Sequence, residues 1–116
     1  MLLVISSVAG DRGRQSNYIY GAAKAGITTL CQGLAHRLAN TNARVVVAKL
    51  GFVDSPMTAH IKKRGPLWST PAKVATLIKA AADNRRATIV YVPSFWRWIM
   101  LVVRLLPSSL LHKTKL

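Results

Sequence analysis

Tyr20 and Lys24 are four residues apart in "NYIYGAAKAG" (residues 17–26), so a helix would place both side chains on one face. Tyr18 has Ala22 at the same offset, so of the two tyrosines only Tyr20 would have an ammonium beside it. A free phenol ionises only near pH 10, and a neighbouring ammonium stabilises the phenolate. A phenol held next to a lysine is therefore a candidate to exchange a proton with a reacting oxygen.

Ser7 is the hydroxyl that would complete such a site. It lies thirteen residues before Tyr20 and closely follows an apolar run of strand length at residues 1–5. Ligands of open parallel sheets bind beyond the carboxyl ends of the strands, so a serine there and a tyrosine in the first helical turn can face one crevice. Ser6 is the less favoured alternative, and the tyrosine–lysine pair alone also fits a surface phenol covered by a lysine stem.

The elements that would position these residues alternate along the chain. Three runs rich in apolar and β-branched residues predict strands, and two segments with helical periodicity lie between them. The predicted strands are residues 1–5, 43–50 and 87–93, and the predicted helices are residues 18–39 and 69–84. This order predicts an α/β fold with a parallel sheet.

Apolar residues in the first helical segment recur at spacings of three and four, which predicts one buried face. Its members are Ala23, Ile27, Leu30, Leu34 and Leu38. Cys31 lies near this face and is expected in the core. Ser69 or Thr70 is expected to cap the second helix, with Pro71 at the first helical position. The buried stripe expected for that helix contains Val74, Leu77, Ile78 and Ala81.

Four ordered signals together resemble the C-terminal half of a short-chain dehydrogenase/reductase. They are "ISSVAG", the spacing from Ser7 to Tyr20, "YGAAKAG", and "GFVDSPMT" after the next strand. The resemblance implies that residues 1–93 form the C-terminal portion of a Rossmann-like parallel sheet. It also implies an enzyme that uses NAD or NADP to reduce a keto group.

The same resemblance implies a role for each matching residue. Tyr20 would protonate the ketone oxygen as hydride arrives, and Ser7 would hold the carbonyl. Lys24 would support the tyrosine and bind the ribose hydroxyls of the nicotinamide half, so Tyr20 and Lys24 would both contact the cofactor.

The loop after the second strand, "LGFVDSPMT", is similar to the loop that contacts the nicotinamide carboxamide in this family. Gly51, Val53 and Ser55 occupy its matching positions. The chain departs from the family pattern at Leu50, where proline is usual, and at Ser55, where threonine is commoner. Serine keeps the hydroxyl, whereas Leu50 removes a residue that rigidifies the turn.

The glycine-rich turn that binds a dinucleotide in this fold has no counterpart in the sequence. "GDRG" at residues 10–13 lacks the required spacing and lies before the active-site helix. We therefore expect the 116-residue chain to be a fragment or truncated form of a protein about twice as long. We expect it to be poorly soluble or partly unfolded alone, and to turn over no substrate.

A narrower resemblance concerns the substrate. "SSVAGDRGRQSNYIYGAAKAG" and the C-terminal "YVPSFWRWIMLVVRLLPSSL" are similar to reductases that act on a decaprenylphosphoryl 2-keto-pentofuranose. The resemblance implies a lipid-linked keto sugar bordered by Gln15, Ser16 and Asn17. This signature does not exclude other lipid or sugar substrates, so the substrate stays open.

Residues 94–116 form a basic and aromatic tail that is expected to be amphipathic. Its apolar core is interrupted by Arg97, Arg104 and Pro107, so it is too short and too charged to span a bilayer. Trp96 and Trp98 beside arginines suit the membrane–water interface. We expect a peripheral membrane contact on the cytoplasmic face, against the alternative of a terminal helix packed on the sheet or on another subunit.

The chain carries 17 lysines and arginines against 3 acids, a formal net charge of +14, which favours an anionic partner. No nucleic-acid-binding motif accompanies this charge, so nucleic acid is the less favoured partner. The three histidines lack metal-ligand spacing, and the single cysteine fits a reducing compartment. Small residues at the start of the first helix allow close packing, and the family resemblance implies that this helix forms a subunit interface in a homo-oligomer. The main rival to an enzyme is a non-catalytic, membrane-associated remnant or interaction protein.

Overall fold

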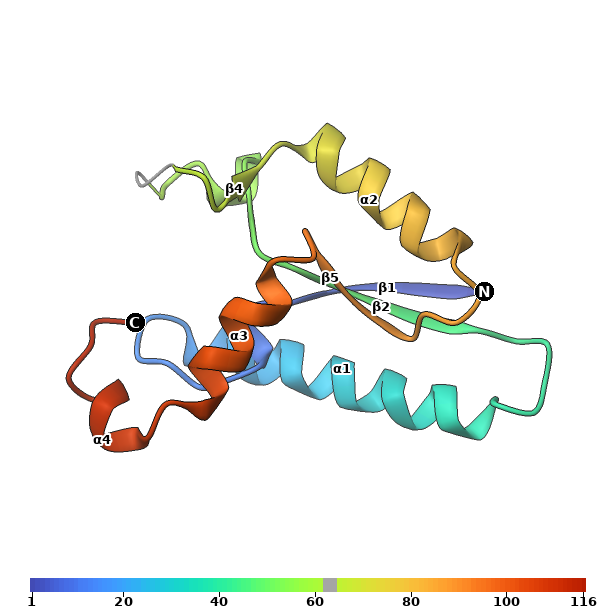
Figure 1. Ribbon diagram of the computed structural model, residues 1–116, viewed down its shortest axis with the longest axis horizontal. Helices are drawn as coiled ribbons and strands as arrows, with labels where there is room; N and C mark the ends of the chain where they lie inside the picture. The colour runs from blue at the N-terminus through green and yellow to red at the C-terminus, as the bar shows by residue number, and fades with distance from the viewer. Residues whose placement is uncertain (62–64) are drawn as a thin grey trace.

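The computed structural model describes residues 1–61 and 65–116 (Figure 1). The basic run at 62–64, part of the positive charge noted above, lies outside the described residues. The expected α/β fold is confirmed, because three strands form a parallel sheet in the order β1-β2-β5. These strands are β1 (Leu2–Ser7), β2 (Val45–Leu50) and β5 (Ile89–Val92).

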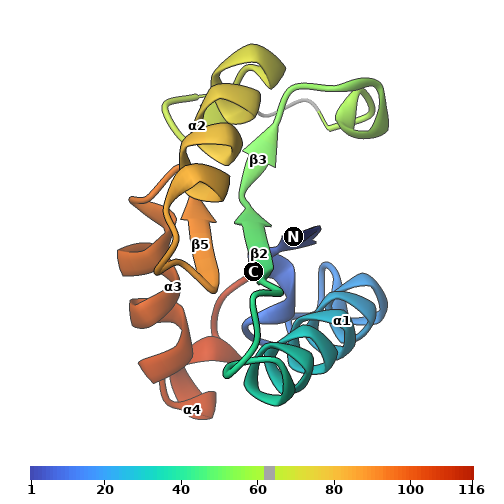
Figure 2. The same cartoon turned by 90° about the vertical axis from the view of Figure 1, so that its right-hand side faces the viewer.

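Helices cover both faces of this sheet. Helix α2 (Pro71–Asp83) lies on one face, while α1 (Tyr18–Arg37) and α3 (Trp96–Leu105) lie on the other, as Figures 1 and 2 show. A short helix α4 (Ser108–Leu111) follows α3. The central strand β2 is the most buried element, and its residues 45–48 have exposed fractions between 0% and 4%.

The strand register aligns the carboxyl ends of the three strands. Ser7 pairs with Leu50, and Leu50 pairs with Val92. Ser7 is the last residue of β1, which extends two residues beyond the strand predicted at residues 1–5. The segments after β1 and β2 therefore leave the sheet at one edge, where ligands of parallel sheets bind.

The buried face of α1 differs from the expected stripe. Leu30 is 65% exposed and Ala23 is exposed, whereas Thr28 and Cys31 are buried. Polar contacts set this rotation, because the Ser6 hydroxyl donates to the carbonyl of Lys24 (3.2 Å) and lies 2.8 Å from the Thr28 hydroxyl. The helix therefore turns its Thr28–Cys31 side towards the sheet, and the core position expected for Cys31 is confirmed.

The second helix begins as the sequence predicts. The Thr70 side chain accepts a hydrogen bond from the Lys73 amide at 3.2 Å, and Pro71 is the first helical residue. Val74 and Ala81 are buried, and Leu77 and Ile78 pack beside them. The expected capping and apolar stripe are both confirmed.

The segment that follows β2, which includes the loop "GFVDSPMT", contains regular structure. Strand β3 (Phe52–Val53) pairs in parallel with β4 (Trp68–Ser69), and a short 3-10 helix, η2 (Pro56–Thr58), follows β3. The Phe52 and Trp68 rings stack with their centroids 5.0 Å apart. Two-residue strands are too short to produce a period-2 pattern, so the sequence carried no signal for them.

The tail forms an amphipathic helix, but one expectation about it is wrong. Trp96 is only 5% exposed, because its indole packs on Gly51 and Phe52, so it cannot lie at a membrane interface in this structure. Trp98, by contrast, is 65% exposed. Within the described part of the chain, no helix has the length and hydropathy needed to cross a membrane.

Candidate active site

Ser7, Tyr20 and Gly51 line one cavity of about 610 Å³ at the carboxyl edge of the sheet. Ser7 ends β1, Tyr20 lies in the first turn of α1, and Gly51 directly follows β2. We call this space the Tyr20 cavity. Three of the residues selected from the sequence therefore meet at one place.

Close packing between the segment after β1 and the start of α1 fixes this arrangement. A 3-10 turn, η1 (Val8–Gly10), lies directly against α1. A Cβ atom added at Gly10 would lie 2.6 Å from the Ala25 amide nitrogen, and one at Gly21 would lie 2.6 Å from the Ala9 carbonyl oxygen. Any side chain at either position would push η1 and α1 apart. Glycine is therefore required at both positions for the two segments to pack this closely.

The hydroxyl of Ser7 keeps its donor function. Its oxygen accepts a hydrogen bond from the Ala9 amide at 3.1 Å, which also caps η1. A serine hydroxyl has one hydrogen to donate and two lone pairs, so Ser7 retains its hydrogen for a group in the cavity.

Lys24 lies beside Tyr20 but is not among the residues that line the cavity. Its ammonium nitrogen is 5.6 Å from the centre of the Tyr20 ring and donates to the Ile5 carbonyl at 3.2 Å. An ammonium has three hydrogens, so this contact leaves two for other acceptors. The helical spacing therefore produces the expected neighbourhood, with the ammonium near the ring.

Val53 and Ser55 are absent from the cavity lining. Val53 packs against the buried cluster of Ala48, Val74 and Val92. The Ser55 amide donates to the Thr58 hydroxyl at 3.1 Å, and the two residues form a capping box around η2. The loop after β2 therefore presents Gly51 to the cavity and directs its next candidate residues elsewhere.

Trp96 is a cavity residue that the sequence reasoning did not select. A Cβ atom added at Gly51 would lie 2.0 Å from both Cε2 and Nε1 of the Trp96 indole. The indole N–H is buried and has no hydrogen-bond acceptor within the described residues. One indirect signal for this position of Trp96 is present in the sequence, because a glycine after a strand can mark the close approach of a bulky group.

The loop that connects β1 to α1 adds two arginines. Arg12 donates to the carbonyl of Val103 at 2.8 Å and to that of Leu106, so it holds the end of α3. Arg14 lines the Tyr20 cavity, and its Nε atom is buried without a partner among residues 1–61 and 65–116. Buried polar groups are normally hydrogen-bonded, so Arg14 Nε and the Trp96 N–H lack the partner that buried donors usually have.

Of the three residues expected to border the substrate, Ser16 and Asn17 line the cavity. Gln15 does not, and its amide instead lies 3.4 Å from the Thr114 carbonyl near the C-terminus. One wall of the cavity is apolar and contains Met57, Ile61, Leu67, Ile99, Met100 and Val103.

Comparison with known proteins agrees with this geometry. A family model described as short chain dehydrogenase matches residues 1–65, which is more than half of the chain. The chain belongs to the short chain dehydrogenase family. The match includes β1, the Ser7–Tyr20–Lys24 set and the Gly51 loop.

Curated relatives support the same assignment. An uncharacterized oxidoreductase of Mycobacterium tuberculosis (strain H37Rv) is 42% identical over 106 residues, covering 91% of this chain and 42% of the relative. One from Streptomyces coelicolor is 39% identical over 112 residues, covering 97% of this chain and 43% of the relative. Carbonyl reductase family member 4 of Xenopus laevis is 37% identical over 59 residues, which are 51% of this chain and 25% of that protein. The chain thus spans about two-fifths of the length of the Mycobacterium tuberculosis and Streptomyces coelicolor relatives.

Proposed function

We propose that the protein functions as an NAD(P)-dependent oxidoreductase that reduces a keto group, with residues 1–93 as the C-terminal portion of the catalytic domain. The observation that carries this proposal is the shared cavity. The Ser7 and Tyr20 side chains line it together, and the Lys24 ammonium lies at the Tyr20 ring.

Each residue has one task in the proposed reaction. The Ser7 hydroxyl donates a hydrogen bond to the ketone oxygen and orients the carbonyl. Tyr20 transfers its phenolic proton to that oxygen as negative charge develops there. Lys24 favours this transfer because its positive charge stabilises the phenolate that remains.

The residues at the cavity fit the nicotinamide end of a dinucleotide. The Tyr20 hydroxyl in the cavity and the Lys24 ammonium beside it would suit ribose hydroxyls, and the buried Trp96 N–H would offer a donor to a carboxamide oxygen. The cofactor, NAD or NADP, would supply the hydride.

We further propose an amphiphilic substrate, namely a keto sugar linked through phosphate to a polyprenyl chain. The half-buried Arg14 side chain lines the cavity and supplies a cation for the phosphate, and His60 lies on the same lining. The apolar wall from α3 and the segment after β3 suits the first units of the lipid.

The tail at 94–116 is the part that we propose contacts the membrane surface on its cytoplasmic side. The side chains of Trp98, Val102 and Leu105 are between 63% and 72% exposed on α3, beside Arg97 and Arg104. Such a face suits an anionic interface. In flotation with phosphatidylglycerol vesicles we expect Trp98→Ser with Leu105→Ser to abolish binding. Equal flotation of the variant and the original would contradict the proposal.

The catalytic proposal is tested in a chimera, because the chain covers only about two-fifths of its relatives. The matching C-terminal segment of the Streptomyces coelicolor relative is replaced by this chain. Oxidation of NADH and NADPH is followed with soluble ketones and with a polyprenyl-phosphate keto sugar. We expect turnover with at least one ketone. A folded chimera that binds cofactor but reduces none would support the non-catalytic alternative.

A further inference from the structure

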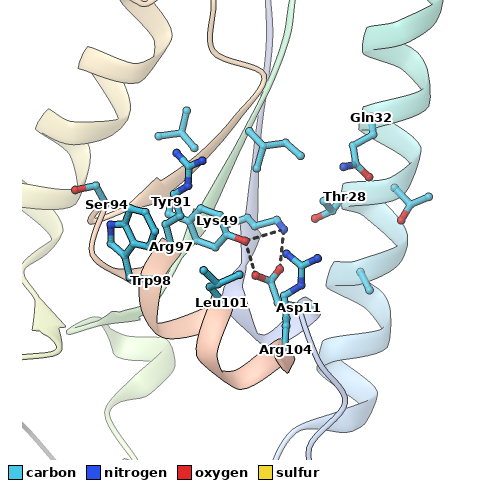
Figure 3. Close-up of a pocket in the computed structure, with 15 residues that line it drawn as sticks. Asp11, Thr28, Gln32, Lys49, Tyr91, Ser94, Arg97, Trp98, Leu101 and Arg104 are labelled. Atoms are coloured by element: carbon cyan, nitrogen blue, oxygen red, sulfur yellow. Dashed lines mark hydrogen bonds and ion pairs between the residues drawn. The ribbon is translucent and has the colours of Figure 1, made fainter. Parts of the chain in front are cut away.

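A second cavity, of about 730 Å³, lies on the other side of α3 from the Tyr20 cavity. It opens between α1 and α3 over the sheet, and the two cavities have no lining residue in common (Figure 3). Helix α3 directs Trp96, Ile99, Met100 and Val103 to the Tyr20 cavity, and Arg97, Trp98, Leu101 and Arg104 to the second one.

A buried polar network forms the floor of this second cavity. The Lys49 ammonium is 2.6 Å from one oxygen of Asp11, and the Tyr91 hydroxyl donates to the other oxygen at 2.5 Å. The Asp11 and Lys49 side chains are only 3% and 11% exposed. Strand alternation explains the position of Lys49, because in β2 it shares the α1-covered face with Val45 and Val47.

This network is suited to binding and not to proton transfer. Burial, and then the hydrogen bond and the charge of Asp11, raise the pKa of Tyr91 to about 12. Tyr91 therefore stays protonated at neutral pH, and its hydrogen is held by Asp11. The single negative charge of Asp11 is paired with the Lys49 ammonium.

The cavity has an excess of positive charge. Lys49, Arg97 and Arg104 line it, whereas Asp11 is the one acid among its lining residues. In Figure 3 the Arg104 guanidinium lies beside Asp11. The lining also includes neutral donors on α1 and after β5, namely Thr29, Gln32 and Ser94.

We propose that this cavity binds a phosphate group through Arg97, Arg104 and Lys49. Guanidinium groups match the oxygens of phosphate in two-point contacts, and hydroxyl and amide donors suit its remaining oxygens. The phosphate can belong to a soluble metabolite or to a lipid headgroup, since exposed Trp98 and Leu101 form the rim.

Calorimetric titration with inorganic phosphate and with glycerol 3-phosphate, at constant ionic strength, tests the site. We expect saturable binding that weakens at least tenfold in Arg104→Gln and in Arg97→Gln. Both arginines are exposed, so these variants should fold. Arg85→Gln is the matched control, because Arg85 is also exposed and does not line the cavity. Absence of saturable binding would overturn the proposal. Equal weakening in Arg85→Gln would also overturn it, because it would show only general attraction to a basic protein.

A second measurement separates the two sources of phosphate. Vesicles containing phosphatidylglycerol are floated with and without excess glycerol 3-phosphate at constant ionic strength. Displacement that is lost in Arg104→Gln would assign the site to a headgroup, while soluble binding without vesicle binding would assign it to a metabolite. Vesicle binding that glycerol 3-phosphate does not displace, together with no soluble binding, would contradict a phosphate site in this cavity.

Discussion

Two tyrosines of this chain have a lysine next to them, and their surroundings prepare them for different tasks. Lys24 is 5.6 Å from the centre of the Tyr20 ring, and Lys49 is 5.1 Å from the centre of the Tyr91 ring. The two pairs differ in the partner of the phenolic hydroxyl. The Tyr91 hydroxyl donates to the Asp11 carboxylate, whereas Tyr20 lines a cavity together with Ser7. A tyrosine–lysine pair is therefore a candidate for proton transfer only when no carboxylate holds the phenolic hydrogen.

Tyr91 gives a pH prediction with a defined sign. Its pKa is raised from 10.0 to about 12, so the folded state holds this proton more tightly than the unfolded state. The resulting stabilisation is complete below pH 10 and is lost as the pH rises through 12. Difference absorbance titration of the original against Tyr91→Phe should show one tyrosine that ionises near pH 12. A difference curve centred near pH 10 would contradict the burial and the Asp11 contact.

Gly51 and Trp96 give a prediction about packing. Gly51→Ala places a methyl group 2.0 Å from the buried indole, so we expect a loss of about 1–3 kcal/mol in the free energy of unfolding. Gly33→Ala is the matched control, because that helical glycine has open space around it and alanine favours helices. Chemical denaturation measures both. Equal stability of the two variants would contradict the seating of Trp96 on Gly51.

At the scale of elements, Arg12 links the active-site loop to the end of α3. Its guanidinium donates to carbonyls at 103 and 106, which the helix itself leaves without amide partners. Helix α3 contributes residues to both cavities, so Arg12 anchors a wall that the two cavities share.

Arg12→Gln should therefore loosen α3 more than it loosens the sheet. We expect amide hydrogen exchange in residues 97–106 to accelerate at least threefold, while exchange in β2 stays unchanged. Arg86→Gln, an exposed arginine in the turn before β5, serves as the control and should change neither. Uniform acceleration throughout the protein would mean that Arg12 stabilises the whole fold and not this helix.

The sequence predicted the elements that have strong periodicity or a clear cap. Strands β1, β2 and β5 and helix α2 follow their patterns, with Thr70 as the cap. The predicted burial of Leu30 was wrong, because the buried Ser6–Thr28 contact sets the rotation of α1 and the apolar spacing does not. The position of Trp96 was also not predicted, since an indole packed on a distant glycine leaves no local pattern.

The candidate site likewise contains some residues whose positions the sequence could predict and others whose positions it could not. Ser7, Tyr20 and Lys24 are placed by a strand end and by helical spacing, which can be read locally. The loop residues Val53 and Ser55 depend on how β3 pairs with β4 and on the capping of η2. These contacts form between segments that are far apart in the sequence or have no clear periodicity. The positions of the Val53 and Ser55 side chains could therefore be seen only in the structure.

At the scale of the molecule, strand β1 forms one edge of the three-stranded sheet and carries exposed apolar residues. Leu2 and Ile5 are 46% and 43% exposed. Open edges with apolar side chains promote association. We expect the isolated chain to self-associate in size-exclusion chromatography, and Ile5→Lys to reduce this association. Exposed Leu110→Lys on α4 is the control for added charge. A monomer at all concentrations, or equal improvement by both variants, would contradict a role for this edge.

The central claim is that Tyr20 supplies the proton in a cavity shared with Ser7. The most direct measurement is the single-turnover rate of ketone reduction in the chimera, comparing Tyr20→Phe with Tyr18→Phe. Tyr18 is 62% exposed and absent from the cavity lining, so its replacement should leave the rate unchanged. We predict that Tyr20→Phe lowers the rate about a hundredfold or more while cofactor affinity changes little. Equal rates for the two variants would contradict the account.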